Sequence, residues 1–385
     1  MTIQTVPLSE VATFVRGVTF DKSQQEDSPK DGNVPLLRAG NIGIKLDVKN
    51  DLIFVPKSVV STKQLLRKGD IAICLSSGSP QVVGKSAPLL SDWNGSVGGF
   101  CGIIRPCDVI DPEYLSLWLR SSAFTNWRDE QARGANIQNL RFSELATLEI
   151  ALPSSDIQRR IAARLKAQLA AVAEARSAAE AQLAELTQLA NALIRQSVEH
   201  KDTKTARLGH VLEEVKNGIG ADWRQHPGLG ATRNGLAPAK EPVGKSPERY
   251  KPVFRGTVFY NPMRIMIGSI AMVDDGDEPG ITSPDYVAFK GRPGKVDSRW
   301  FYYWLRSPYG EHCIASLARG AVRERMLFNR LAEGEIELPP YEVQLATSRT
   351  LAQIGPMKAE IKAQQLEIDR LPACLLAQAF EGMAP

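Results

Sequence analysis

An internal repeat constrains the fold of this chain more than any other feature of its sequence. The tetrapeptide Trp-Leu-Arg-Ser at residues 118–121 recurs at residues 304–307, an offset of 186. The same offset relates three further pairs: Arg-Gly-Ala at 133–135 and 319–321, Leu-Pro at 152–153 and 338–339, and Gln158 and Gln344. One register held over about 40 residues predicts two copies of a single structural unit.

Each copy has a first part that reads as a mixed α/β globule, over residues 1–150 and 203–338. Short segments rich in β-branched and aromatic residues predict strands at residues 70–75, 102–104, 257–260 and 285–289. Asp111-Pro112 and residues 296–298 have the composition of helix starts, just before the two copies of Trp-Leu-Arg-Ser. The fold class that follows is α+β, with two globules in one chain.

Each copy continues into a long helix, over residues 151–202 and 339–385. Residues 156–199 contain neither Gly nor Pro, and Ser155-x-x-Gln158 has the pattern of a capping box. Leucines and isoleucines recur at steps of three and four, which is an apolar helical stripe. Roughly 44 residues at 1.5 Å each extend about 66 Å, too long for the core of one globule. In the second copy, Gly355-Pro356 and Pro372 predict a break or kinks.

The two apolar stripes must be buried, and the simplest partner for one helix is the other. Antiparallel pairing as a coiled coil would separate the two globules and relate the two copies by a pseudo-twofold axis. The alternative is that each helix packs on its own globule or on another protein.

The composition is that of an ordinary globular protein, with 43% apolar and 23% charged residues. The five cysteines are irregularly spaced without a C-x-x-C pair, and the four histidines are scattered, so we expect neither a disulfide framework nor a metal site. The N-terminal residues lack the pattern of a signal peptide, and no run of 18 apolar residues occurs. We therefore expect a soluble cytoplasmic protein without a membrane segment.

Three motifs resemble catalytic sequences but depart from them. Residues 78–86 (Gly-Ser-Pro-Gln-Val-Val-Gly-Lys-Ser) resemble a phosphate-binding loop, but five residues separate the glycines where four are required. We interpret them as a turn between strands, with Lys85 available to a phosphate. Leu-Pro-Pro-Tyr at 338–341 resembles an amino-methyltransferase motif but has Leu where a polar side chain must accept from the amine. Asp31 and Asp47 do not form a convincing nuclease pair, so a binding or assembly role is favoured.

The excess positive charge lies in the second globule. Residues 203–338 carry 20 basic and 16 acidic residues, a net charge of +4, whereas residues 1–150 carry 16 of each. The whole chain has a net charge of +4. This balance permits a polyanionic partner without requiring one.

The doubled order of globule and helix, each helix introduced by Leu-Pro-x-x-x-x-Gln, resembles the specificity subunit of type I restriction-modification systems. The residues that carry the likeness are Leu152-Pro153 with 158–161, Leu338-Pro339-Pro340 with Gln344, and the preceding stretches 133–140 and 319–321. Residues 35–42 (Pro-Leu-Leu-Arg-Ala-Gly-Asn-Ile) and 283–287 are also typical of that family's recognition domains. The resemblance covers essentially the whole chain.

The resemblance implies that residues 1–150 and 203–338 are target recognition domains, each reading one half of a bipartite site in double-stranded DNA. It implies that the helices set the half-site separation and dock two methyltransferase subunits, which a restriction subunit can join. S-adenosylmethionine, ATP and Mg would then belong to those partners, and this chain would carry no cofactor and no catalytic residue. Because the globules differ in sequence, we expect an asymmetric target.

Arg, Lys, Asn, Gln and Ser side chains read bases or hold phosphates in DNA complexes. We predict DNA-binding residues in loops of both globules: Ser76, Ser77, Ser79, Lys85, Arg133, Asn136 and Gln138 in the first, and Asn261, Arg264, Arg319, Arg323 and Arg325 in the second.

Two other functions remain open from the sequence. One is the specificity protein of a related type II system, whose partner fuses nuclease and methyltransferase. The other is a coiled-coil scaffold that binds no DNA, which a steep salt dependence of DNA binding would contradict. An enzyme acting alone is the least favoured function.

Overall fold

The computed structural model describes residues 4–133, 139–318 and 325–380. The chain forms two compact units. The first comprises residues 1–177 and 366–385, and the second comprises residues 178–365. The long helix α5 (Ser155–Val198) therefore contributes its first part to one unit and its remainder to the other.

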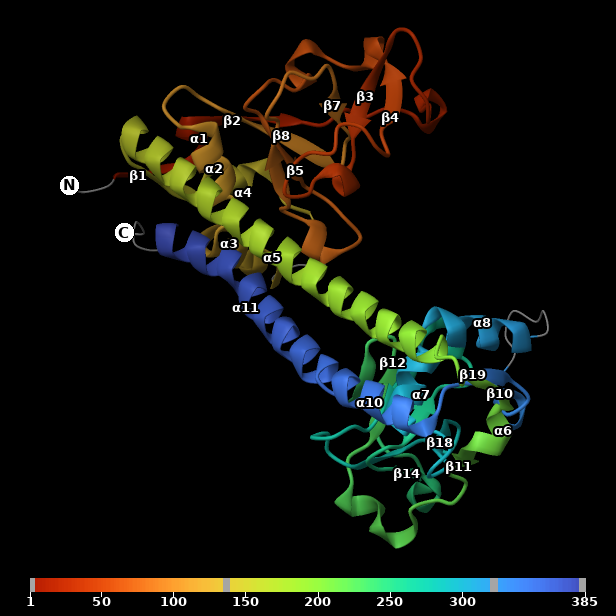
Figure 1. Ribbon diagram of the computed structural model, residues 1–385. Coiled ribbons are helices and arrows are strands. Elements are labelled where there is room, and N and C mark those ends of the chain that lie inside the picture. Colours follow the sequence, from red (N-terminus) through yellow and green to blue (C-terminus); the bar gives the residue numbers. More distant parts are fainter. Residues whose placement is uncertain (1–3, 134–138, 319–324, 381–385) are drawn as a thin grey trace. The chain divides into compact units, whose positions relative to one another are not determined.

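The first unit is built on small sheets, which are antiparallel except for the parallel pairing of β3 with β7 (Figure 1). Its four-stranded sheet has the order β2-β8-β5-β6. The strands are β2 (Ala12–Arg16), β8 (Cys101–Pro106), β5 (Ile71–Cys74) and β6 (Ser86–Pro88). A three-stranded sheet has the order β4-β3-β7, with β4 (Ile53–Pro56), β3 (Asn33–Leu37) and β7 (Ser96–Val97). A further pair joins β1 (Gln4–Pro7) to β9 (Glu149–Leu152).

Helices cover one side of the four-stranded sheet of the first unit. They are α1 (Leu8–Val11), α2 (Pro112–Trp118), α3 (Ser122–Arg133), α4 (Phe142–Ala146) and the start of α5. Asp111 caps α2, because its Oδ1 accepts a hydrogen bond from the Tyr114 N–H at 2.9 Å. The apolar core joins residues of this sheet, of α2 and of both long helices, such as Ile104, Tyr114, Leu165 and Phe380.

The second unit repeats the four-stranded sheet in the order β11-β18-β15-β16. Its strands are β11 (Leu212–Glu214), β18 (Val287–Gly291), β15 (Val258–Tyr260) and β16 (Ile270–Met272). The pair β10 (Lys204–Arg207) and β19 (Glu335–Leu338) corresponds to β1 and β9. In place of a three-stranded sheet, its described residues form two antiparallel pairs: the hairpin of β12 (Leu229–Thr232) with β13 (Gly235–Pro238), and β14 (Lys251–Val253) with β17 (Gly280–Thr282).

The helices of the second unit follow the same order along the chain. They are α6 (Leu208–Val211), α7 (Ser298–Leu305), α8 (Pro308–Leu317), α9 (Phe328–Leu331) and α10 (Tyr341–Leu351). Asp297 caps α7 through a 2.9 Å hydrogen bond from the Trp300 N–H. The core of this unit includes Ile194 of α5, Trp300 of α7 and Ile354 at the start of α11 (Ile354–Phe380).

The predicted helix starts at Asp111-Pro112 and Asp297 are confirmed. A break before Gly355-Pro356 is also confirmed, since α10 ends at Leu351 and α11 begins at Ile354. Pro356 then lies in the first turn of α11, where a missing N–H costs least. Pro372 lies within α11, which continues through it.

Two local predictions are wrong. Gln158 does not complete a capping box, because its side chain binds main-chain groups of the globule instead. The strand predicted from Asp285 begins only at Val287, because residues 283–286 form a turn closed by a hydrogen bond from the Tyr286 N–H to the Ser283 carbonyl at 3.0 Å. All five cysteines are free thiols.

Candidate nucleic-acid interface

Four predicted residues lie in the connection between β5 and β6 of the first unit. Ser76 donates its N–H to the Phe100 carbonyl at 3.0 Å, and the Ser77 hydroxyl accepts from the Ser79 N–H at 3.2 Å. Ser79 and Lys85 are exposed, and Ser76 and Ser77 are half-buried. The chain passes through a 3₁₀ turn at Pro80–Val82 into a strand, not into a helix. Residues 78–86 are therefore a turn between strands and not a phosphate-binding loop, whose second glycine opens a helix.

The corresponding connection in the second unit joins β15 to β16 and carries Asn261 and Arg264. The Asn261 Oδ1 accepts from the Met263 N–H at 2.9 Å, so this side chain shapes the turn itself. Arg264 is exposed. Both connections end at a glycine with positive φ, Gly84 at 82° and Gly268 at 78°. The two connections thus share a glycine of this conformation just before the next strand but present different side chains.

Arg325 lies next to the second connection. The following residue, Met326, donates its N–H to the Pro262 carbonyl at 3.1 Å, which fixes residues 325–327 against residues 261–264. The Arg325 Nη2 contacts Asp285 Oδ1 at 3.3 Å, in an exposed ion pair. The structure therefore brings Asn261, Arg264 and Arg325 into one surface region.

The remaining predicted residues cannot be placed in the same way. Asn136, Gln138, Arg319 and Arg323 lie outside the described residues, and Arg133 is the last residue of α3, with its side chain outside the description. Among the described residues close to these two gaps, Asn139 forms a β-bridge with Ser76, and the Met326 N–H donates to the Pro262 carbonyl.

The arginine of the repeated Trp-Leu-Arg-Ser positions the second connection. Arg306 donates to the carbonyls of Ile270 at 2.8 Å, Gly268 at 3.2 Å and Arg233 at 2.6 Å. The bonds to Gly268 and Ile270 fix the end of the turn that follows Arg264 and the start of β16, and the bond to Arg233 joins them to the loop between β12 and β13. In the first unit the equivalent Arg120 is half-buried, and its burial lowers the pKa of its guanidinium.

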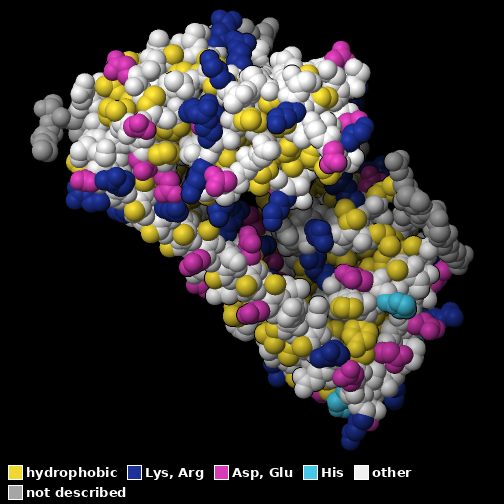
Figure 2. Space-filling model, turned by 90° about the horizontal axis from the view of Figure 1, so that it is seen from above, with side chains coloured by type: hydrophobic (Ala, Val, Ile, Leu, Met, Phe, Trp, Pro, Cys, Tyr) yellow, Lys and Arg dark blue, Asp and Glu magenta, His cyan; other side chains and the backbone are white. Residues whose placement is uncertain are grey.

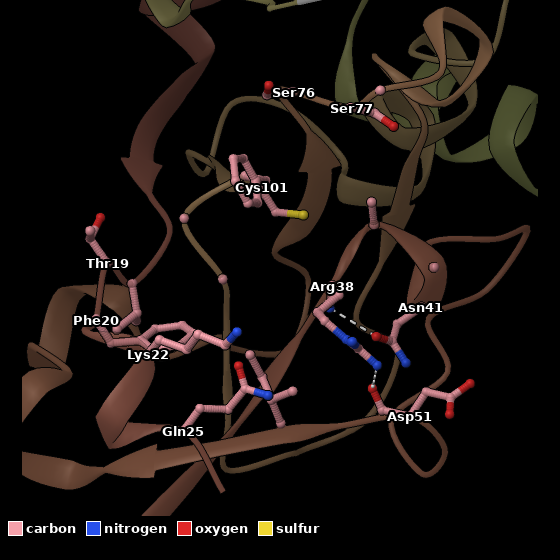
Figure 3. A pocket seen from close by; sticks show the side chains of 18 residues that line it. Thr19, Phe20, Lys22, Gln25, Arg38, Asn41, Asp51, Ser76, Ser77 and Cys101 are labelled. Carbon is pink, nitrogen blue, oxygen red and sulfur yellow. Dashed lines mark hydrogen bonds between the residues drawn. The ribbon is translucent and has the colours of Figure 1, made fainter. Parts of the chain in front are cut away.

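In the first unit, a pocket of about 890 Å³ is lined in part by Ser76 and Ser77 (Figure 3). Besides Ser76 and Ser77, its polar lining includes five residues that were not predicted to contact DNA: Thr19, Lys22, Gln25, Arg38 and Asn41. Val18, Phe20, Ile53 and Phe100 supply an apolar lining.

Asn41 organises the Arg38 side of this pocket. It is 4% exposed; its Oδ1 accepts from the Arg38 N–H at 2.8 Å, and its Nδ2 donates to the Asn50 carbonyl at 2.7 Å. The Arg38 Nη2 donates to the Asp51 carbonyl at 2.9 Å. The signal that could have found this site was the stretch 35–42, which was noted only for its family likeness.

Charges on the visible surface are mixed. In Figure 2, Lys and Arg side chains are interspersed with Asp and Glu and with hydrophobic groups. The described residues contain no group of three or more His, Cys, Asp or Glu side chains that could hold a metal ion. Across these same residues, no helix has the length and apolar character that crossing a membrane requires.

Comparison with known proteins identifies relatives over the whole chain. The family model for the type I restriction modification DNA specificity domain matches residues 2–180. The specificity subunit of the type I restriction enzyme StySPI from Salmonella potsdam is 36% identical over 208 residues, which are 54% of this chain and 45% of that subunit. The EcoKI specificity subunit of Escherichia coli K12 is 33% identical over 407 residues, covering 98% of this chain and 88% of that one.

Solved structures share the fold. A chain from a study of complex assembly and conformational transition in the type I R-M system aligns over 100% of this chain and 98% of its own length, with a TM-score of 0.69 and 18% identity. The HsdS subunit from Thermoanaerobacter tengcongensis covers 99% of this chain and 97% of its own length, with a TM-score of 0.54 and 21% identity. Together with the EcoKI match, these findings confirm the expected resemblance: the chain belongs to the family of specificity subunits of type I restriction enzymes.

Proposed function

We propose that this chain is the non-catalytic subunit that recognises a bipartite DNA site and assembles a type I restriction-modification complex on it. The observation that carries the proposal is a scaffold built twice with different loops. The sheets β2-β8-β5-β6 and β11-β18-β15-β16 have the same strand order, yet the connection after β5 presents serines and a lysine, whereas that after β15 presents Asn261 and Arg264. Two sheets of the same strand order that carry loops of different sequence are suited to recognise two different half-sites.

In this function, residues 1–150 and 203–338 are the two target recognition domains. Hydroxyl, amide and guanidinium groups are the side chains that contact base edges and phosphates in DNA complexes. Lys85 and Arg264 are exposed, as contact with a phosphate requires. Asn139 and Met326, which are described, contact these two connections. We propose that the predicted residues of the neighbouring sequence contact DNA as well.

The helices at 151–202 and 339–385 would act as the spacer between half-sites. In the first unit, Leu165 of α5 and Phe380 near the end of α11 share one core. In the second, Ile194 near the end of α5 shares a core with Ile354 at the start of α11. These contacts support antiparallel pairing of α5 with α11 and a pseudo-twofold relation between the copies.

The methyltransferase and restriction subunits would be the partners of this assembly, and we propose two methyltransferase subunits, one for each copy of the repeat. S-adenosylmethionine, ATP and Mg would bind to those partners. The complex would then act on DNA in the cytoplasm. Both curated relatives are named as type I subunits, which favours this function over the related type II system.

Mapping of modified bases tests the proposal. The chain is expressed with its neighbouring methyltransferase in a host that lacks this methylation, and modified bases are located genome-wide. We expect an asymmetric two-part motif with a fixed gap, methylated on both strands. A palindromic motif would contradict the prediction of two different half-sites.

A folded complex that purifies together but neither methylates nor binds DNA would favour a scaffold. Binding is measured over a range of salt concentrations, because phosphate contacts make log K fall steeply with log salt. A double variant, Asn261→Ala with Arg264→Ala, tests whether the second globule recognises only one half of the DNA motif. We expect it to alter one half of the motif and to leave the other half unchanged.

A further inference from the structure

The pocket at Arg38 is lined at one end by residues 76–78 of the β5–β6 connection, but most of its lining comes from other segments. These are the turn that follows β3, residues 18–25, residues 51–53 and residues 98–101. In Figure 3, Lys22 and Gln25 approach from one side, Arg38 from the other, and Ser76 and Ser77 lie at one end. We propose that Arg38 reads a base edge of the half-site bound by the first globule and that Lys22 holds a neighbouring phosphate. This inference rests on the proposed DNA-recognition function.

The Arg38 side chain is held in place before any ligand binds. Its main chain is fixed by the buried Asn41, and its Nη2 donates to the Asp51 carbonyl at 2.9 Å. Asp51 itself has a positive φ of 51°, so its carbonyl direction is set by the loop. A guanidinium carries five N–H donors, and one fixed bond orients its plane while other donors remain for a ligand.

This geometry suits guanine best among the bases. The major-groove edge of guanine offers two adjacent acceptors, N7 and O6, which a planar guanidinium contacts with two parallel hydrogen bonds. A side chain that is already oriented loses less conformational entropy on binding than a mobile one. Arg38 is therefore better suited to reading a base than the exposed Lys85, whose ammonium group lacks the planar pair of donors.

Lys22 occupies a different position in the pocket, on a short 3₁₀ turn, Lys22–Gln24. Asp21 caps this turn, with its Oδ1 accepting from the Ser23 N–H at 2.9 Å, while Gln24 Oε1 accepts from the Asp21 N–H at 2.9 Å. The turn fixes the base of the Lys22 side chain and leaves its ammonium group exposed. An ammonium is a compact point charge without directional pairing, which suits a phosphate.

The charge and the lining of the pocket also fit a nucleotide. Lys22 and Arg38 line it with one acidic residue, Asp51, whose main-chain oxygen faces the Arg38 guanidinium in Figure 3. Phe100 borders the pocket with 74% of its surface exposed. An aromatic face beside a cationic rim offers apolar contact to a base or sugar while phosphates meet the cations.

The sheet whose strand β3 ends just before Arg38 distinguishes the two globules. β3 belongs to the sheet β4-β3-β7, whereas the described part of the second unit has two separate strand pairs in its place. Loss of Arg38 should therefore affect one half of a two-part motif. The other half serves as an internal control in the same experiment.

The test compares Arg38→Gln, Arg38→Lys, Lys22→Gln and the control Lys57→Gln, each expressed with the neighbouring methyltransferase. Lys57 is exposed, lies in the same globule and does not line the pocket. Motifs are mapped genome-wide, and each purified complex is titrated with the wild-type site and with duplexes that carry single base changes. Thermal unfolding of each complex shows whether the variant is folded.

We expect both Arg38 variants to lose discrimination at one position of one half-site by about tenfold to a hundredfold. Lys22→Gln should weaken binding to all these duplexes equally and reduce the salt slope by about one. Lys57→Gln should leave the motif and the affinity unchanged.

Three outcomes would overturn the inference. An unchanged motif and affinity for a folded Arg38→Gln complex would mean that Arg38 only supports the Asp51 loop. A uniform loss that Arg38→Lys restores would make Arg38 a phosphate contact. Failure of the wild-type complex to methylate or to bind DNA would instead contradict the proposed function, and this inference with it.

Discussion

The side-chain Oε1 of Gln158 accepts a hydrogen bond from the main-chain N–H of Asp111 at 2.7 Å. Its Nε2 donates to the carbonyls of Val109 at 3.2 Å and Pro153 at 2.8 Å. The second copy repeats all three bonds 186 residues later: Gln344 accepts from Asp297 at 2.9 Å and donates to Lys295 at 3.1 Å and Pro339 at 2.8 Å. One buried amide thus joins the start of each long helix to the loop that caps a globular helix.

Replacing either glutamine should destabilise the unit that contains it. Gln158 is 1% exposed and Gln344 is fully buried, so Ala at either position leaves main-chain groups without partners. Each change should cost about 1–3 kcal/mol of unfolding free energy. Urea unfolding of Gln158→Ala and Gln344→Ala measures this cost, with the exposed Gln168→Ala as the control. Equal stability of all three variants would show that the three-bond anchor is dispensable.

Tyr114 should make the first unit sensitive to alkaline pH. Its hydroxyl donates to the Ala151 carbonyl at 2.8 Å, and burial raises the pKa of Tyr114 to about 12. The unfolded-state pKa is about 10, so the neutral phenol contributes stability below pH 10 that is lost as the pH rises toward 12.

Tyr114→Phe removes this contribution. It should lower stability by about 1 kcal/mol near neutral pH, because the Ala151 carbonyl loses its donor. The difference between wild type and Tyr114→Phe should shrink between pH 10 and 12. Unfolding curves across this range provide the check, and a constant difference would contradict titration of Tyr114.

Removing one partner of the ion pair between Arg105 and Asp70 should lower the free energy of unfolding far more than removing one partner of a surface pair. Arg105 Nη2 and Nε contact the two Asp70 oxygens at 2.7 and 2.9 Å, and the side chains are 16% and 3% exposed. Arg105 also donates to the Leu65 carbonyl at 2.9 Å. Removing one partner of a buried pair leaves an uncompensated charge, so Arg105→Gln should cost about 3–5 kcal/mol.

The pair Arg370–Glu367 provides the control for this prediction. Its side chains are 70% and 71% exposed, and pairs of this kind contribute at most about 1 kcal/mol. Chemical unfolding of Arg105→Gln and Arg370→Gln compares the two environments directly. Similar losses in both would show that burial does not set the strength of the Arg105 pair.

Replacing Gly268 should lower the stability of the second unit because of its backbone conformation alone. Its φ is 78°, and the nearest atom to an added Cβ, in Arg233, would lie 3.8 Å away. Gly268→Ala should therefore cost about 1–2 kcal/mol through backbone strain rather than through a clash. Gly355→Ala is the control. Gly355 lies in α11 with open space around it, so this change should not destabilise the protein. Thermal unfolding of the two variants checks the contrast, and equal losses would mean that φ is not the cause.

Local chemistry made much of the scaffold predictable. An Asp followed by a helical segment marked the starts of α2 and α7, and the absence of Gly and Pro marked the long α5. Helix caps and helical periodicity depend on residues within one or two turns, so they can be seen in a linear sequence. The prediction for Gln158 failed because the same pattern, Ser-x-x-Gln, can bond across 47 residues when a globule offers main-chain partners.

The sequence by itself determined that the chain is built twice from a globule and a long helix, because an offset of 186 residues and a helical stripe are properties of residue order. Only the tertiary structure decided which polar residues share a surface. Arg38, Lys22 and Ser77 line one pocket because the turn after β3, the turn at residues 22–24 and the connection after β5 lie next to one another in the fold. Such contacts depend on the packing of segments that are tens of residues apart in the chain. The composition of each loop therefore does not reveal them.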